Sequence, residues 1–205
     1  MLKLETHVYI SQNEGKDWEE MMNIDGIVTG LYRHPYDDTR AIVGTSGRKQ
    51  YITKDRGVNW DVMEMPLPSA SLSFNVNPWS FHPTEPDWII YLGETGCNFD
   101  RDDHCHIEAF VTLDGGAHWD TLETWVRSCS WARDARFKQV HLSGVYCEQY
   151  NDRSGSQKTA MGAGTPVRLV YTETLMRAGS KLLFEAIVGY AIYSDYLIVA
   201  EVRSE

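Results

Sequence analysis

The stretch YITKDRGVNW, residues 51–60, decides the fold of this 205-residue chain because two other segments match it. They are YISQNEGKDW at residues 9–18 and FVTLDGGAHW at residues 110–119. In each copy an aromatic and a β-branched residue lead to Ser or Thr, then to Asp or Asn, Gly and Trp at fixed spacing. The matched residues are Ser11, Asn13, Gly15, Trp18, Thr53, Asp55, Gly57, Trp60, Thr112, Asp114, Gly116 and Trp119.

Each copy is typical of a β-hairpin corner that fixes its own geometry. The alternating residues at its start predict a strand that enters a turn. The Asp or Asn side chain and the Ser or Thr hydroxyl can accept backbone N–H bonds inside that turn. Glycine tolerates the positive φ that such a turn needs. The tryptophan opens the next strand and is expected to bury a large apolar area behind the turn.

The spacing of the copies predicts four-stranded blades of a β-propeller. Ser11 and Thr53 lie 42 residues apart, and a propeller blade takes roughly 40–45 residues. Thr53 and Thr112 lie 59 residues apart, which we interpret as a blade with an insertion at residues 97–105. The strands expected in these intervals are residues 27–33, 41–45, 49–53, 60–65, 79–82, 88–94 and 107–112.

A second repeat lies outside these boxes. The turn HPYDD at residues 34–38 is matched by HPTEP at residues 82–86. Both segments are rich in turn-forming residues and follow an expected strand. The correspondence supports a true repeat of the whole unit.

A fourth, degenerate copy of the box follows the strand RLVYT at residues 168–172, with Gly179 and Leu183 or Phe184 as substitutes for the missing Gly and Trp. Apolar strands are expected at residues 184–193 and 196–202, joined by a turn at Ser194 and Asp195. Residues 150–166 are polar and rich in Gly and Ser, so we expect a mobile surface loop there.

These intervals predict an all-β chain that is an incomplete part of a propeller. A partial blade covers about residues 1–26, blades follow at about 27–66, 67–126 and 127–188, and a further blade starts at about 189–205. Since a propeller must close on itself, we expect the remaining blades to come from a longer chain.

Composition excludes several classes of protein. The chain is 42% hydrophobic and 23% charged, as in globular domains. A net charge of -10 disfavours non-specific nucleic-acid binding. No apolar run reaches the roughly 20 residues of a membrane span, and the N-terminal segment is too short and polar for a signal peptide. We expect no nucleic-acid partner, no membrane span and no targeting signal in this chain.

The four cysteines are Cys97, Cys105, Cys129 and Cys147. They allow three pairings, of which the in-order one closes two short polar loops and is the simplest. Disulfides would place the chain in an oxidising compartment. That fits a piece of a longer secreted or lumenal protein.

The cluster CNFDRDDHCHIE, residues 97–108, offers Cys, His and carboxylate groups, but its spacing fits no familiar zinc pattern. We expect a disulfide-closed surface loop, with no metal and no cofactor. The box residues Asp55 and Asp114 are interpreted as turn staples and not as catalytic acids.

An enzymatic alternative is a glycoside hydrolase. A sialidase needs arginines on separate blades around a central pocket, whereas Arg33, Arg40 and Arg48 lie in one predicted blade. Two aspartates that face each other from different blades could serve a polysaccharide hydrolase. The sequence names no catalytic residue, so the enzyme stays the alternative.

The repeats match the Asp box, S/T-x-D-x-G-x-x-W, which is found in sialidases, some plant-polysaccharide hydrolases, a photosystem assembly factor and sortilin-type vacuolar sorting receptors. Five segments resemble the lumenal domain of the fungal sortilin-type receptors: FHPTEPDWIIYLGETGC, CHIEAFVTLDGGAHW, VRSCSWARDARF, YCEQY and LLFEAIVGYAIYSDYLIVAEV. The resemblance covers nearly the whole chain in register.

This resemblance implies the early blades of a ten-bladed β-propeller with no enzymatic activity. The propeller would lie on the lumenal side of Golgi, endosome or vacuole membranes, in a single-pass receptor that carries soluble hydrolases to the vacuole or endosome. The implied partners are protein or peptide cargo and the remaining blades. The implied disulfides are Cys129–Cys147, across a family loop, and Cys97–Cys105, a fungal-type extra bridge. No residue matches the family's peptide-binding surface, so ligand-binding residues stay unassigned. An inactive truncated product is a further alternative.

Overall fold

The computed structural model describes residues 6–21, 24–97, 104–132, 141–151, 153, 156–157, 165–193 and 196–203. The strands in the first half of the chain are β1 (Tyr9–Ile10), β2 (Glu19–Glu20), β3 (Val28–Arg33), β4 (Ala41–Thr45), β5 (Lys49–Thr53), β6 (Asp61–Glu64), β7 (Trp79–Phe81) and β8 (Ile89–Thr95). Those in the second half are β9 (His106–Thr112), β10 (Asp120–Thr124), β11 (Val126–Trp131), β12 (Val145–Gln149), β13 (Val167–Thr172), β14 (Lys181–Ile192) and β15 (Leu197–Glu201). A short helix, α1 (Ser71–Phe74), precedes β7.

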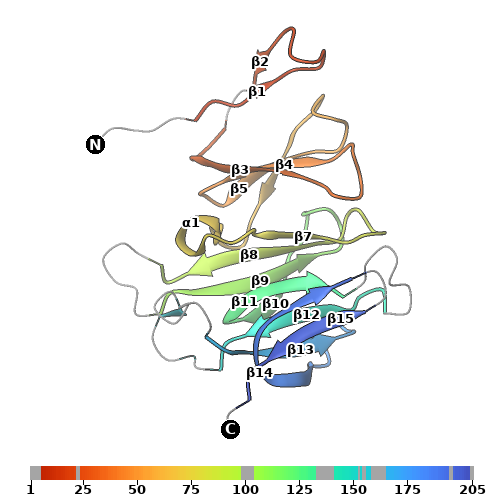
Figure 1. The fold of residues 1–205 in the computed structure, drawn as a ribbon. Coiled ribbons are helices and arrows are strands. Elements are labelled where there is room, and N and C mark those ends of the chain that lie inside the picture. The colour runs from red at the N-terminus through yellow and green to blue at the C-terminus, as the bar shows by residue number, and fades with distance from the viewer. Residues whose placement is uncertain are drawn as a thin grey trace.

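The strands pair antiparallel and, within the described residues, form one hairpin and three sheets. β1 and β2 make the hairpin, β3–β6 the first sheet, β7–β10 the second sheet and β11–β15 the third sheet. Figure 1 shows them stacked in chain order, with the hairpin at one end and the third sheet at the other. The prediction of an all-β chain with four-stranded antiparallel sheets is confirmed for the first and second sheets.

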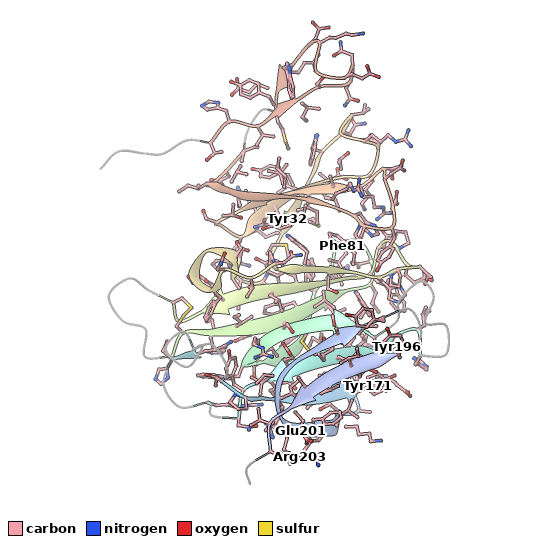
Figure 2. All side chains as sticks on the ribbon, in the orientation of Figure 1. Tyr32, Phe81, Tyr171, Tyr196, Glu201 and Arg203 are labelled. Atoms are coloured by element: carbon pink, nitrogen blue, oxygen red, sulfur yellow. A yellow bond between two sulfur atoms is a disulfide. The ribbon has the colours of Figure 1, made fainter. Side chains whose placement is uncertain are left out.

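Strand β8 shows why successive sheets stack. Ile89 and Tyr91 join an apolar cluster with the first sheet, whereas Ile90 and Leu92 join one with the third sheet. Alternate side chains of a strand point to opposite faces of its sheet. The second sheet is therefore buried on both faces, which explains the unbroken apolar run IIYL. Tyr32 and Phe81, labelled in Figure 2, belong to the cluster between the first and second sheets.

The third sheet has five strands because β14 pairs with two partners along its length. Residues Lys181 to Ile187 pair with β13, and Ile187 to Ile192 pair with β15. The change of partner falls at Ile187 and Gly189, where the register with β15 shifts. The second half of β14 packs back on β11 and β12, since the hydroxyls of Tyr190 and Ser130 are 2.5 Å apart and the rings of Tyr190 and Tyr146 have centroids 5.8 Å apart.

The predicted strands agree closely with the observed ones, but two strands were missed. β11 and β12 had no predicted counterpart, because their sequences VRSCSW and VYCEQ mix polar residues into both faces, whereas β10 begins directly after Trp119, where the third box predicts a strand. The predicted turn at residues 194–195 and most of the predicted loop at 150–166 lie outside the described residues. The described part of that loop includes Gln157, which is 1% exposed and is therefore a buried residue and not a surface one.

Candidate functional site

The third Asp box shows what the repeated residues do. The Thr112 hydroxyl accepts the N–H of Asp114 at 3.3 Å and of Gly116 at 3.0 Å, and donates to Asp114 Oδ1 at 2.8 Å. Asp114 Oδ1 also accepts the N–H of His118 at 3.0 Å. The second box repeats the pattern, with Thr53 bound to Asp55 and Gly57. These side chains satisfy the backbone of a tight turn.

The electrostatics of the boxes agree with a structural role. Backbone donation from His118 lowers the pKa of the Asp114 carboxyl to about 2, against an ordinary value of 3.8, and the hydrogen bonds from the His118 and Thr112 side chains add to this effect. The pKa of Asp55 is lowered in the same direction, chiefly by the backbone N–H of Asn59. A carboxylate held ionised in this way is a poor proton donor at neutral pH.

The fourth copy keeps the hydrogen bonds of the box with different residues. Thr172 Oγ1 accepts from the N–H of Thr174 at 3.1 Å and of Met176 at 3.2 Å, and Thr174 Oγ1 accepts from the N–H of Ala178 at 3.1 Å. Thr174 therefore occupies the Asp position and Met176 the Gly position. The prediction that Gly179 takes the place of the box glycine was wrong, because the register is set by the Thr172 hydroxyl.

Two consecutive residues of each box adopt a left-handed backbone, and this geometry survives without glycine. In the fourth box they are Leu175 and Met176, with φ of 52° and 62°. Both side chains pack on the core between the second and third sheets. Burial of these apolar groups offsets a backbone strain of roughly 1–2 kcal/mol per residue.

The box tryptophans are less buried than predicted. Trp18 is 62% exposed, while Trp60 and Trp119 are half-buried. The indole N–H groups of Trp18 and Trp60 each donate to the carbonyl of their own box glycine at 3.1 Å. Trp79 and Trp131, in contrast, are core residues at 5% and 4% exposure.

The two HP turns form a second repeated device, which we call the HP corners. At the second corner, His82 Nδ1 accepts the N–H of Thr84 at 3.2 Å and of Glu85 at 3.0 Å. Its other nitrogen, Nε2, lies 2.9 Å from the carbonyl oxygen of Leu142, so it carries the proton and donates. The first corner repeats the hydrogen bond at Nδ1, because His34 Nδ1 accepts the N–H of Tyr36 at 3.2 Å.

A groove opens between the two HP corners, and we call it the corner groove. Its volume is about 530 Å³. Its lining includes Arg33 at the end of β3, His34, Tyr36, Asp37 and Asp38 of the first corner, and Pro83, Thr84 and Pro86 of the second. A neighbouring hollow of about 450 Å³ runs along β3 and β7 and shares Arg33 and Tyr36 with it.

Arg40 joins the two corners beside this groove. It donates to Asp37 Oδ2 in its own corner at 3.0 Å, and to Asp87 Oδ1 and the Pro86 carbonyl across the sheet boundary at 2.7 and 3.0 Å. Its side chain is 14% exposed. The first and second sheets are thus tied at the end where the groove opens.

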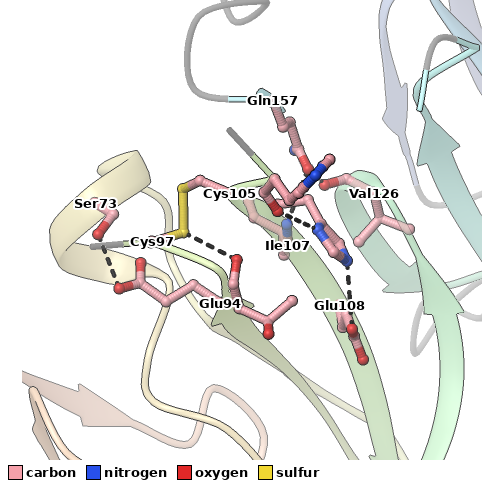
Figure 3. Close-up of a disulfide and its surroundings, with 11 residues drawn as sticks. Ser73, Glu94, Cys97, Cys105, Ile107, Glu108, Val126 and Gln157 are labelled. Carbon is pink, nitrogen blue, oxygen red and sulfur yellow. Dashed lines mark hydrogen bonds and ion pairs between the residues drawn. A yellow bond between two sulfur atoms is a disulfide. The ribbon is translucent and has the colours of Figure 1, made fainter. Parts of the chain in front are cut away.

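The cysteines form the disulfides Cys97–Cys105 and Cys129–Cys147. Figure 3 shows the first of them with Gln157 nearby: this side chain accepts the N–H of Ile107 at 2.9 Å and donates to the carbonyl of Val126 at 2.7 Å. Gln157 thereby links the second sheet to the third.

No metal centre is found among the described residues, where no group of three or more His, Cys, Asp or Glu side chains is arranged to hold an ion. In the described part of the predicted cluster, His106 Nδ1 donates to the carbonyl of His104 at 2.7 Å, and its ring stacks on Trp125. Residues 98–103 of that cluster lie outside the described residues. The helix in the described part of the chain is far too short to span a membrane.

The Sortilin-Vps10 family model, described as "Sortilin, neurotensin receptor 3", matches residues 6–205. The chain belongs to the Sortilin-Vps10 family. This Sortilin-Vps10 chain is 33% identical over 201 residues to vacuolar protein sorting/targeting protein 10 of Mycosarcoma maydis, covering 95% of this chain and 13% of that protein. It is 32% identical over 206 residues to the protein of the same name from Laccaria bicolor, covering 100% and 14%. The chain thus spans about one seventh of the length of these relatives.

The fold of this Sortilin-Vps10 chain also has a counterpart among solved structures. An uncharacterised protein of Listeria monocytogenes superposes with a TM-score of 0.52 at 14% identity, covering 93% of this chain and 50% of that one. This likeness concerns the fold alone. The HP corners and the corner groove were not identified as a site from the sequence. The repeated HP turns at residues 34–38 and 82–86 were the signal that could have located them.

Proposed function

We propose that this chain is part of the lumenal cargo-binding domain of a membrane sorting receptor that carries soluble hydrolases from the Golgi to the vacuole or endosome. The observation that carries the proposal is the family match over residues 6–205. Relatives that cover nearly the whole chain are named for vacuolar protein sorting and targeting. The two disulfides suit the oxidising lumen in which such a domain works.

The proposal includes the architecture of a ten-bladed propeller, of which this chain supplies early blades. The stacked antiparallel sheets support it. The change of partner along β14 supports the predicted blade boundary near residue 189, because one half of the strand completes a sheet and the other half pairs onward with β15. The partners in this proposal are the remaining blades and protein or peptide cargo.

We propose a receptor without enzymatic activity over an Asp-box glycoside hydrolase. The box carboxylates Asp55 and Asp114 are occupied by donors of their own turns and lie on hairpin corners. A glycosidase needs two carboxyl groups about 5–10 Å apart across a sugar site, one of them able to give up a proton. Turnover of sialosides or β-glucans by the longer protein would favour the enzyme.

The test is removal of the gene that encodes this chain from its own organism. The expected result is that a soluble vacuolar hydrolase appears in the culture medium, and that re-expression of the full-length protein returns it to the vacuole. Hydrolase activity in the medium and in isolated vacuoles is measured in both strains. Unchanged distribution would refute the sorting role, and it would leave the inactive truncated product as the better account.

A further inference from the structure

The two HP corners differ at one atom. His82 Nε2 donates to the main-chain carbonyl of Leu142, which reaches it from the connection between β11 and β12. His34 is 2% exposed, and its Nε2 has no hydrogen-bond partner in the part of the chain that the structure describes. Because Nδ1 of His34 already accepts the N–H of Tyr36, a neutral ring carries its proton on Nε2. The first corner thus holds a buried donor without an acceptor.

The difference follows from the lengths of two connections. Residues 132–144 join β11 to β12, and Leu142, in the described end of this connection, brings its carbonyl to the His82 ring. The equivalent connection, residues 82–88 between β7 and β8, is itself the second HP corner and is much shorter. Within the described residues it brings no acceptor to His34 Nε2, and the corner groove lies between the two corners.

We propose that the corner groove binds an extended peptide segment, whose main-chain carbonyl accepts from His34 Nε2 as the carbonyl of Leu142 accepts from His82. This inference rests on the proposed function, because it places one cargo-contact site of the receptor at the boundary of the first and second sheets. Unpaired buried donors are rare, and each is unfavourable until an acceptor arrives. The rings of His34, Tyr36 and His82 line the groove, and aromatic rings also line grooves that recognise extended peptides.

Charge favours an acidic residue in that peptide. Asp37 is held by Arg40, and Asp38 by Arg56. Arg33, which lines the corner groove and the hollow beside it, has no ion pair within the described residues. It is exposed and offers a guanidinium to a carboxylate of the bound segment.

The incoming carbonyl must displace a side chain, since Nε2 itself is shielded. Tyr36 is the exposed neighbour that lines the groove beside the ring: its ring centroid lies 6.2 Å from that of His34, and the residue is 48% exposed. Rotamer changes of exposed side chains occur in picoseconds to nanoseconds. The opposite side of the ring stays packed against Phe81, with centroids 4.7 Å apart.

The experiment uses the full-length protein and linear ten-residue peptides displayed on phage. The peptide with the highest affinity is synthesised with a fluorophore, and its Kd is measured by anisotropy for wild type, Arg33→Glu and His34→Phe. Arg177→Glu is the matched control, because its side chain is 69% exposed and lies in the fourth box. Thermal unfolding of each variant checks its folding.

We expect His34→Phe to raise the Kd about tenfold, the usual effect of one lost hydrogen bond. Arg33→Glu should raise it at least tenfold, and more at low salt. Arg177→Glu should leave it unchanged. If no selected peptide depends on Arg33, the inference is wrong, even where His34→Phe fails to fold.

This outcome is separate from the sorting experiment. A strain that secretes its hydrolase after deletion, combined with peptides insensitive to Arg33, refutes only the corner groove. Correct hydrolase sorting in the deletion strain refutes the receptor role, whatever the peptides do.

Discussion

The loss of stability on removing one Asp-box hydroxyl depends on how deeply that box is buried. Thr112 and Ser11 make the same three hydrogen bonds in the third and first boxes. Thr112 is 1% exposed, whereas Ser11 lies in an exposed hairpin. Thr112→Val keeps the shape but leaves two backbone N–H groups without an acceptor, so at about 1 kcal/mol per hydrogen bond we expect a loss of roughly 3 kcal/mol. Ser11→Ala should cost less than about 1 kcal/mol, because water replaces the hydroxyl.

The assay is urea unfolding of disulfide-intact protein, followed by tryptophan fluorescence. With an m-value near 2–3 kcal/mol/M, Thr112→Val should lower the midpoint by roughly 1 M, and Ser11→Ala by a few tenths at most. The m-values must match wild type for the comparison to hold. Equal shifts in the two variants would refute the reasoning, since burial would then not set the cost of the box.

Other predictions concern the turns and the buried charges. Gly116→Ala should destabilise by roughly 2–3 kcal/mol in the same assay, because its Cβ would lie 2.6 Å from a buried methionine sulfur at a φ of +97°. Gly179 has a φ of +85°, and a Cβ added there would meet no atom within 4 Å, so Gly179→Ala should cost about 1 kcal/mol. Equal losses for Gly116→Ala and Gly179→Ala would exclude the steric contribution at Gly116. Arg127→Ala should cost about 3 kcal/mol, because it removes the charge partner of Glu148, which is 7% exposed and bound by Arg127 at 2.9 and 2.5 Å, and leaves the carboxylate with the Ser128 hydroxyl. A loss under 1 kcal/mol would contradict this. The Asp114 carboxylate stabilises the fold above its unfolded pKa of 3.8, and the contribution is lost as pH falls towards about 2. Unfolding curves taken at each pH between 4 and 2 should show a smaller loss of stability for Asp114→Asn than for wild type. The difference should be less than about 1 kcal/mol, because solvent screens the interaction. The same dependence of stability on pH in Asp114→Asn and wild type would argue against the hydrogen bonds to the Asp114 carboxylate.

Local chemistry explains why much of the fold could be predicted. A box needs one hydroxyl, one acceptor and two left-handed residues within a few positions, so the sequence carries it directly. Strands β4 and β5 were predicted at their observed bounds because their apolar runs end at turn formers. The pattern was weaker for β11 and β12, where buried Glu148 is tolerated because Arg127 and Ser128 on the neighbouring strand both donate to it.

The sequence by itself determined the repeated hairpin corners and the family of this chain, because both depend on residues close together in the chain. Only the tertiary structure decided the role of each histidine in the HP corners. His34 and His82 occupy the same position in the repeat, yet one donates to a distant carbonyl and the other does not. The acceptor of His82 lies 60 residues away. Whether a carbonyl reaches such a ring depends on the length of a connection in the next sheet, and no local pattern around the histidine carries that information.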